Sequence, residues 1–191
     1  MPFDLTRFRA QLIGDAARPN LFQVILPFPS ETDLRGDLGR ASEKFSFFCR
    51  ASQIPGATMG SVPVFYFGRE IKIPGNKTFA EWTVTVFNDE DFAVRNVFER
   101  WMGEINSHRE NLRADGMRQA NDGYASDGRV IQYAKTGEII RQYKLIGLWP
   151  MDISPIDLDW GANDSLEEWT ATLAYQWWEV EGESAQSIST D

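Results

Sequence analysis

The sequence predicts a mainly β domain, in which an antiparallel sandwich or barrel of strands packs beside one internal α-helix. Segments with the strand period of two occupy most of the chain, and they follow one another without alternating with helices. One internal segment carries a long apolar stripe at helical spacing. With 191 residues, the chain has room for one domain with its own core, which we expect over residues 1–180.

The N-terminal quarter of the chain predicts a helix, two strands and a loop. Apolar residues on one side predict a short N-terminal helix over residues 3–13. The run 21–28 is largely apolar at both odd and even positions, which predicts a strand buried on both faces. The polar, glycine-containing stretch 29–44 predicts an exposed loop. A second strand is expected over residues 44–52, paired antiparallel with the first.

Residues 53–77 predict a hairpin arm. They contain three prolines and four glycines, and two strand-like runs flank Gly68. Large apolar side chains occupy consecutive positions before this turn, so they would cover both faces of a short strand. A monomer seldom exposes such a surface, which indicates a partner; the alternative is that the arm folds back onto its own core. The candidate contact residues are Val64, Phe65, Tyr66, Phe67, Ile71 and Ile73.

The centre of the chain contains the clearest strand and the clearest helix. Residues 79–89 alternate Trp82, Val84 and Val86 with mostly polar neighbours, as expected of a half-buried strand. Residues 88–108 then place apolar side chains at helical spacing. This stripe is expected to pack on the sheet, and its members are Val94, Val97, Phe98, Trp101, Met102 and Ile105.

The last third of the chain predicts a hairpin and a closing strand. The stretch 109–127 is polar and without period, which predicts an exposed loop. The runs 129–135 and 138–149 flank a short glycine turn and are expected to form the hairpin. Residues 166–180 alternate with a period of two and predict one long closing strand. The polar, acidic tail 181–191 is expected to be disordered.

The charge of the chain is unevenly distributed. The net charge is −9, yet residues 1–144 carry 19 Lys and Arg against 18 Asp and Glu. Residues 145–191 contain ten Asp and Glu and neither Lys nor Arg. A segment of this kind repels nucleic acid instead of binding it, although a solvated acidic face would have the same composition. The whole acidic excess therefore lies after Lys144.

The sequence gives little support to an enzyme or to a cofactor site. His108, the single histidine, follows the predicted helix in a charged stretch, where a surface cation is the ordinary interpretation. Cys49 is the single cysteine, so an internal disulfide and a cysteine-based metal cluster are excluded. Asp157 and Asp159 are spaced to face one way from a strand, but no further chemical group accompanies them. We therefore expect a non-catalytic protein without a metal or cofactor site.

Several short segments, which keep their order over roughly residues 16–179, carry a family resemblance. They cover the entry into the first strand, the central strand, the last hairpin and the closing strand. Their most characteristic residues are Arg18, Pro19, Asn20, Trp82, Trp149, Pro150, Asp159 and Trp160. Together they resemble the tail tube proteins of contractile-tailed, myovirus-type bacteriophages. The segments 29–44, 109–127 and everything after Val180 depart from the family pattern.

The resemblance implies a hexameric assembly. Family members form rings of six protomers around a continuous inner β-barrel, and the rings stack into a tube inside a contractile sheath. DNA passes through the tube during ejection. The hairpin arm then becomes the candidate ring-stacking surface. An acidic lumen would come from the C-terminal part of the chain, with Asp157, Asp159, Glu167 and Glu168 as the candidate acids.

The resemblance also implies the partners and the location of the protein. The expected partners are further copies of the chain, the tail sheath protein, and the baseplate and tail terminator proteins. The tape measure protein and genomic DNA would occupy the lumen without specific binding, and no membrane partner is expected. The protein would belong to the virion, in the phage tail, and would assemble in the cytoplasm of the bacterial host.

Two other functions remain open at this point. The first is a tube subunit of a type VI secretion or phage-derived contractile injection system, which would have the same fold and ring but a protein cargo. The second is a β-sandwich carbohydrate-binding module or hydrolase, suggested by the seven tryptophans and the acids. The first alternative predicts the same assembly, whereas the second predicts a monomer that binds or cleaves glycans.

Overall fold

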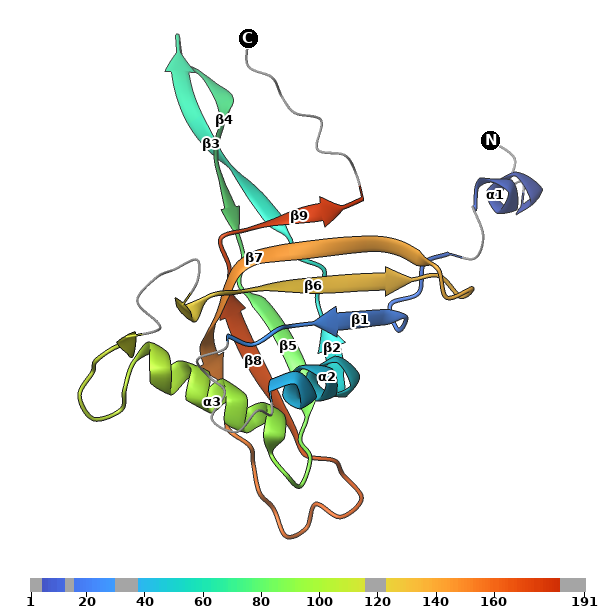
Figure 1. The fold of residues 1–191 in the computed structure, drawn as a ribbon. Coiled ribbons are helices and arrows are strands. Elements are labelled where there is room, and N and C mark those ends of the chain that lie inside the picture. The colour runs from blue at the N-terminus through green and yellow to red at the C-terminus, as the bar shows by residue number, and fades with distance from the viewer. Residues whose placement is uncertain (1–4, 13–15, 30–37, 116–122, 183–191) are drawn as a thin grey trace.

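The computed structural model describes residues 5–12, 16–29, 38–115 and 123–182. Antiparallel strands dominate it, and the helices α2 and α3 pack against one end of the strands (Figure 1). The helices are Leu5–Gln11 (α1), Leu38–Phe48 (α2) and Ala93–Ile105 (α3). The strands are Phe22–Ile25 (β1), Cys49–Ser52 (β2), Ala57–Tyr66 (β3), Arg69–Phe79 (β4), Trp82–Phe87 (β5), Ser126–Tyr133 (β6), Ile139–Ile153 (β7), Glu168–Ala174 (β8) and Trp177–Glu181 (β9).

One long strand, β7, joins two layers of the sheet. Its first part pairs with β6 and β9, and its last part, from Trp149, pairs with β8. The full order is β1-β6-β7-β8-β5-β2, with β9 beside β7. Strands β5 and β8 therefore run across β1 and β6 instead of lying in one flat layer (Figure 1). This confirms the predicted mainly β, antiparallel architecture.

Gly147 lies where β7 passes from one layer to the other. Its φ of 71° is in the left-handed region that favours glycine, and a Cβ there would lie 2.9 Å from Cγ of Gln176. The Gly147 N–H donates to Oδ1 of Asp127 at 3.1 Å. The closing segment breaks opposite this point, because β8 ends at Ala174 and β9 begins at Trp177. The single closing strand predicted over 166–180 is therefore wrong: the chain changes its pairing partners midway and forms two strands.

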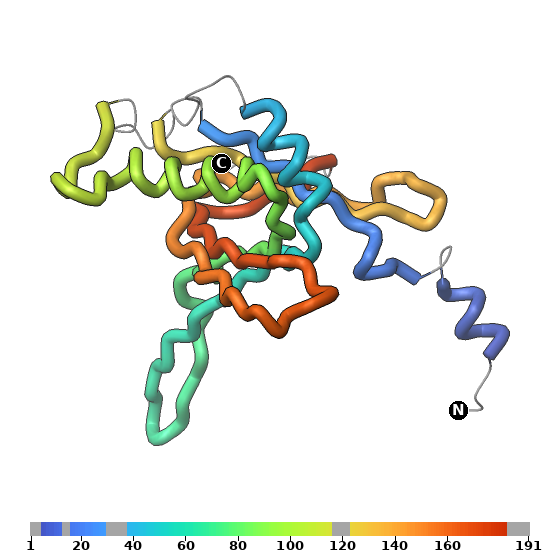
Figure 2. The backbone as a smooth tube through the Cα atoms, turned by 90° about the horizontal axis from the view of Figure 1, so that it is seen from below, coloured from blue at the N-terminus to red at the C-terminus, as the bar shows by residue number. Residues whose placement is uncertain are grey.

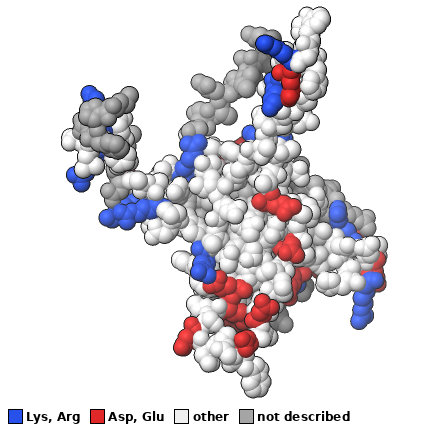
Figure 3. Space-filling view, turned by 180° about the vertical axis from the view of Figure 1, so that it is seen from behind, with Lys and Arg blue, Asp and Glu red and all other residues white. Residues whose placement is uncertain are grey.

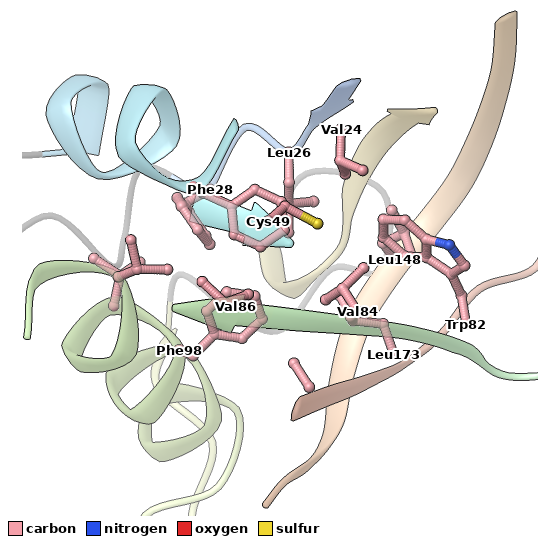
Figure 4. Packing of buried hydrophobic residues seen from close by; sticks show 14 of the residues in the cluster. Val24, Leu26, Phe28, Cys49, Trp82, Val84, Val86, Phe98, Leu148 and Leu173 are labelled. Atoms are coloured by element: carbon pink, nitrogen blue, oxygen red, sulfur yellow. The ribbon is translucent and has the colours of Figure 1, made fainter. Parts of the chain in front are cut away.

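The core lies between the two layers and the helices. Trp82, Val84 and Val86 of β5 point inward with less than 2% exposure, as their alternation predicted. Figure 4 shows them facing side chains from β1, β7, β8 and α3 across one continuous apolar cluster. Phe98 of α3 packs edge-on against Trp169 of β8, with ring centroids 5.3 Å apart. The predicted apolar stripe of the internal helix thus packs on the sheet.

Residues 38–48 form a helix where the sequence predicted the end of an exposed loop and the start of a strand. Ala41 and Phe45 of α2 are buried one turn apart, and the Phe45 ring lies 6.1 Å from that of Phe28. Lys44, the next residue before Phe45, binds Asp89 and Asp91 ahead of α3, and its hydrogen bond lowers the pKa of Asp91. The prediction failed because two patterns overlap here. Apolar residues recur every three or four positions, as in a helix, but they are part of a run of consecutive aromatic residues that resembles a strand.

The first two predicted strands also pair differently from the prediction. β1 pairs antiparallel with β6, and β2, reduced to Cys49–Ser52, pairs with β5. The hairpin of β6 and β7 is confirmed. Residues 109–113 are exposed as predicted, whereas Gly123 is buried. Residues 30–37 and 116–122 of the two predicted loops, and residues 183–191 of the predicted tail, lie outside the described residues.

Two segments project from the body (Figure 2). The first is α1, whose residues are all exposed and which confirms the predicted N-terminal helix. The second is the hairpin of β3 and β4. Within the described residues, no helix combines the length and the apolar character that crossing a membrane requires.

Candidate assembly surfaces

The predicted hairpin arm is present as strands β3 and β4. The two strands pair antiparallel from Ala57 opposite Phe79 to Tyr66 opposite Arg69. The two turn residues, Phe67 and Gly68, have φ values of 45° and 79°. Positive φ at both central residues is typical of the two-residue turns that match the twist of a hairpin. The paired strands give the arm its own backbone hydrogen bonds, so it keeps its shape while it extends away from the body (Figure 1).

The apolar side chains of the arm face solvent in the single chain. Phe65 is 72% exposed and Phe67 89% exposed, and the other four candidate contact residues are each exposed by at least 42%. The alternative that the arm folds back onto its own core is therefore wrong. The Tyr66 and Phe67 rings contact each other edge-on, with centroids 4.5 Å apart, and form an apolar tip. Such a surface is typical of a protein contact site.

Phe67 occupies a backbone conformation that its side chain disfavours. A left-handed conformation costs an ordinary residue roughly 1–2 kcal/mol, and asparagine or glycine is preferred at this place in a turn. At 89% exposure, Phe67 regains little of that cost from packing within the chain. The strained backbone and the exposed ring together indicate that the Phe67 side chain contacts a partner.

The four acids expected at the lumen divide into two groups. Asp157 and Asp159 lie in the segment 154–167, which connects β7 to β8 at the end of the molecule opposite the arm (Figure 1). Glu167 and Glu168 lie where this segment enters β8, and Glu168 forms an ion pair with Arg50 of β2. Glu167 accepts a hydrogen bond from the neutral Asn88 side chain at 3.1 Å.

The segment 154–167 contains exposed apolar residues that sequence reasoning missed as a surface. Trp160 is fully exposed, and Leu158 and Leu166 are exposed by 85% and 75%. In the sequence, these apolar residues lie among acids in a stretch that contains proline and glycine. Such a stretch predicts a loop and not a buried strand. The outer face of α1, with Leu5 and Phe8, is exposed in the same way.

The other family-motif residues lie in the core, in paired strands or in the turn before β1. Trp82 is buried in the core, and its indole N–H donates to the Gln53 carbonyl oxygen at 2.9 Å. Trp149 and Pro150 pair with the end of β8. The turn that leads into β1 contains Arg18, Pro19 and Asn20, and the Leu21 N–H donates to the Arg18 carbonyl oxygen.

The described residues hold no cluster of metal-ligating side chains. Cys49 is buried, and this burial raises the pKa of its thiol to about 12, so it stays protonated and unreactive at neutral pH. An open pocket of about 470 Å³ lies between the ends of β7 and β9, but its acid Glu181 is bound to Arg129. The chemically distinctive features of the described chain are thus its surfaces for contact.

Comparison with known proteins identifies the family of the chain. A family model for phage tail tube proteins matches residues 17–181. The chain belongs to the phage tail tube protein family. It is 32% identical over 172 residues to the tail tube protein gp19 of Enterobacteria phage T4, which covers 90% of this chain and 96% of that protein. It is 26% identical over 166 residues to the tail tube protein of Serratia phage KSP90, with coverages of 85% and 87%.

Chains of two solved assemblies share the fold of this family member. A chain of the anti-feeding prophage baseplate superimposes with a TM-score of 0.61 at 13% identity, covering 88% of this chain and 97% of that chain. A chain of the sheath-tube complex of the extracellular contractile injection system PVC superimposes with a TM-score of 0.54 at 13% identity, with coverages of 93% and 97%. The family match confirms the resemblance to tail tube proteins that the ordered segments suggested over roughly residues 16–179.

Proposed function

We propose that this chain is the subunit of the inner tail tube of a contractile phage tail, in which hexameric rings stack into a tube that conducts DNA. Membership of the tail tube family carries the proposal. The exposed arm supplies the kind of surface that a stacked assembly requires.

The sheet edges support a closed ring. Within the described residues, β1, β2 and β9 each pair with a strand on one side only. Unpaired strand edges are aggregation hazards unless another strand or a covering segment occupies them. A head-to-tail contact between copies pairs the edges and closes into a ring when the rotation returns to its start. We expect six copies in that ring, joined around a continuous inner β-barrel.

The position of the acids supports an acidic lumen only in part. Glu167 is hydrogen-bonded to the neutral Asn88 amide, whereas Glu168 forms an ion pair with the cation of Arg50. Repulsion of DNA reaches about 8 Å at physiological salt, so only charges on the channel wall matter. We propose Glu167 as the first lumen acid to test.

Reversal of the Glu167 charge is expected to slow DNA ejection. In assembled particles, Glu167→Lys would place a cation where DNA slides past, because phosphate groups bind lysine. Glu167→Gln, which preserves the shape and the Asn88 contact, is the control and should have a smaller effect. Ejection followed by dye release from packaged DNA measures the rate. An unchanged rate in Glu167→Lys particles places this residue away from the lumen.

The proposed partners follow from the same assembly. The solved tube proteins of similar fold come from complexes described as a sheath-tube complex, a baseplate and a terminating cap. We propose that this chain likewise contacts a sheath protein, a baseplate and a tail terminator, with tape measure protein and DNA in the lumen. Its place would be the virion, after assembly in the host cytoplasm.

Assembly of the purified chain tests the proposal. At high concentration, negative-stain electron microscopy is expected to show rings of six subunits and hollow tubes. Co-expression with the sheath protein of the same genome should lengthen the tubes if assembly needs a partner. Monodisperse monomers under both conditions would contradict the proposal. Capsid, portal and terminase genes beside the coding sequence would favour a phage tail over an injection system with protein cargo.

The carbohydrate-binding alternative has little support, because only Trp160 and Trp177 of the seven tryptophans are exposed. Sugar-binding platforms use exposed aromatic rings, yet Trp82, Trp101 and Trp169 are buried in the core. Trp178 is partly buried and donates its N–H to the Gly56 carbonyl oxygen at 3.1 Å, at the base of the arm. Tryptophans that inspired this alternative therefore serve largely to hold the fold together.

A further inference from the structure

The loop 154–167, here called the distal loop, exposes apolar side chains at the end of the molecule opposite the arm (Figure 1). Trp160 has no covered surface in the single chain, and Leu158 and Leu166 are nearly as exposed. A fully exposed tryptophan stabilises nothing within its own chain. Large aromatic side chains of this kind are the residues that most often dominate the energy of protein interfaces.

The distal loop has a defined shape although it contains neither helix nor strand. The Asp159 carboxylate accepts a hydrogen bond from the Gly161 N–H at 2.9 Å, and the Asp159 carbonyl oxygen accepts one from the Ala162 N–H at 3.1 Å. The Ser165 hydroxyl donates to the Ala162 carbonyl oxygen at 3.4 Å. These local bonds hold Trp160 on a preformed turn, so that binding a partner requires little ordering of the backbone.

The distal loop and the arm have opposite charges. The loop contains Asp157, Asp159, Asp164 and Glu167 and neither Lys nor Arg. The arm contains Arg69, Lys72 and Lys77 against the single acid Glu70. Figure 3 shows acidic side chains gathered over the end of the molecule opposite the arm, and basic side chains together with acidic atoms near the arm tip. Complementary charges of this kind steer association and fix the orientation of two partners.

The two surfaces are also placed for head-to-tail contact. The arm and the distal loop leave the body in opposite directions, so the arm of one copy cannot reach its own distal loop (Figure 1). A ten-residue strand such as β3 extends over about 33 Å, which is long enough to reach a second copy stacked on the first. A contact between two different surfaces of one chain repeats without end along an axis, as a tube requires.

We propose that the distal loop is the receptor for the arm: the apolar arm tip of one copy docks on Trp160 of a copy in the next ring, and Asp157 and Asp159 face the arm cations. The proposal rests on the proposed stacking of rings and adds the surface that receives the arm. It assigns Asp157 and Asp159 to the contact between rings, in place of the lumen role expected from the sequence.

A photo-crosslinking experiment tests which segment covers Trp160. Benzoylphenylalanine replaces Trp160 in the full chain, assembled tubes are irradiated, and mass spectrometry identifies the attached peptides. Crosslinks to residues 57–79 of another copy are expected in tubes and not in unassembled protein. The same probe at Leu112, an exposed apolar position outside both surfaces, is the control and should not mark the arm. Crosslinks from position 160 in tubes that avoid the arm would overturn the proposal.

Substitution of the tryptophan gives a second, independent measurement. Trp160→Ala is expected to raise the protein concentration needed for tube formation by about tenfold or more, as for an interface anchor. Leu112→Ala is expected to assemble like the unmodified chain. Failure of the unmodified chain to form rings or tubes would count against the proposed function itself. Normal tubes from the unmodified chain and equally stable tubes from Trp160→Ala would overturn the arm receptor alone.

Discussion

A chain with a polar arm tip is expected to fold normally and to lose the ability to stack rings. The change is Phe65→Thr combined with Phe67→Asn. Both side chains are largely exposed in the single chain, so their removal should change the free energy of unfolding only slightly. Threonine suits a strand, and asparagine before Gly68 suits the two-residue turn better than phenylalanine does. The arm should therefore keep its hairpin while it loses its apolar surface.

The expected effect on assembly is large because each ring presents several arms at once. Burial of one phenylalanine side chain is worth roughly 1.5–3 kcal/mol, and two are lost per arm. Electron microscopy and sedimentation should show single rings or free protomers where the unmodified chain forms tubes. The melting temperature should stay the same or rise slightly. Tubes of normal length from this variant would show that the arm tip does not hold the rings together.

A matched substitution separates the role of the arm from a general loss of exposed apolar surface. Leu112→Asn removes an exposed apolar side chain from the loop after α3 and changes nothing in the arm. Tubes should form normally from this control chain. If it fails to stack as well, nonspecific adhesion of apolar surface, and not a specific arm contact, drives assembly.

The sequence predicted the parts of the fold that depend on one clear period. Trp82, Val84 and Val86 alternate with largely polar residues, and the structure buries all three. The stripe of α3 gave the same kind of signal at helical spacing, and Val94, Val97, Phe98 and Trp101 are its buried members. The hairpin arm was also predictable from its prolines, its glycines and the two strand-like runs that flank Gly68, whereas the sequence left open whether the arm is exposed or folds back onto the core.

Two features were not predictable because they depend on distant parts of the chain. Helix α2 is set by the contact of Phe45 with Phe28 and Phe98, whereas its local sequence suits a strand as well. The break between β8 and β9 is set by Gln176, whose N–H donates to the Ile146 carbonyl oxygen at 2.9 Å beside Gly147. The orientation of the distal loop away from the arm follows only from the three-dimensional path of the strands (Figure 1).

Loss of the Trp101 side chain is expected to destabilise the protomer more than any change in the assembly surfaces. Trp101 is fully buried in α3, edge-on to Phe28 with ring centroids 6.0 Å apart. Its indole N–H donates to the Tyr124 carbonyl oxygen at 2.6 Å and joins the helix to the chain that leads into β6. Trp101→Ala should lower the free energy of unfolding by about 3–5 kcal/mol, because it leaves a cavity and an unpaired buried carbonyl. Urea unfolding followed by circular dichroism measures this loss.

Two further variants distinguish packing from hydrogen bonding and stability from assembly. Trp101→Phe keeps most of the ring and loses the N–H, so we expect a loss of about 1–3 kcal/mol. Trp160→Ala removes the same kind of side chain from a fully exposed position, and the free energy of unfolding should not change. A stable chain that cannot stack, beside an unstable chain whose surfaces are intact, would show that the core and the assembly surfaces act separately. Equal destabilisation by both alanine variants would instead place Trp160 in a contact within its own chain.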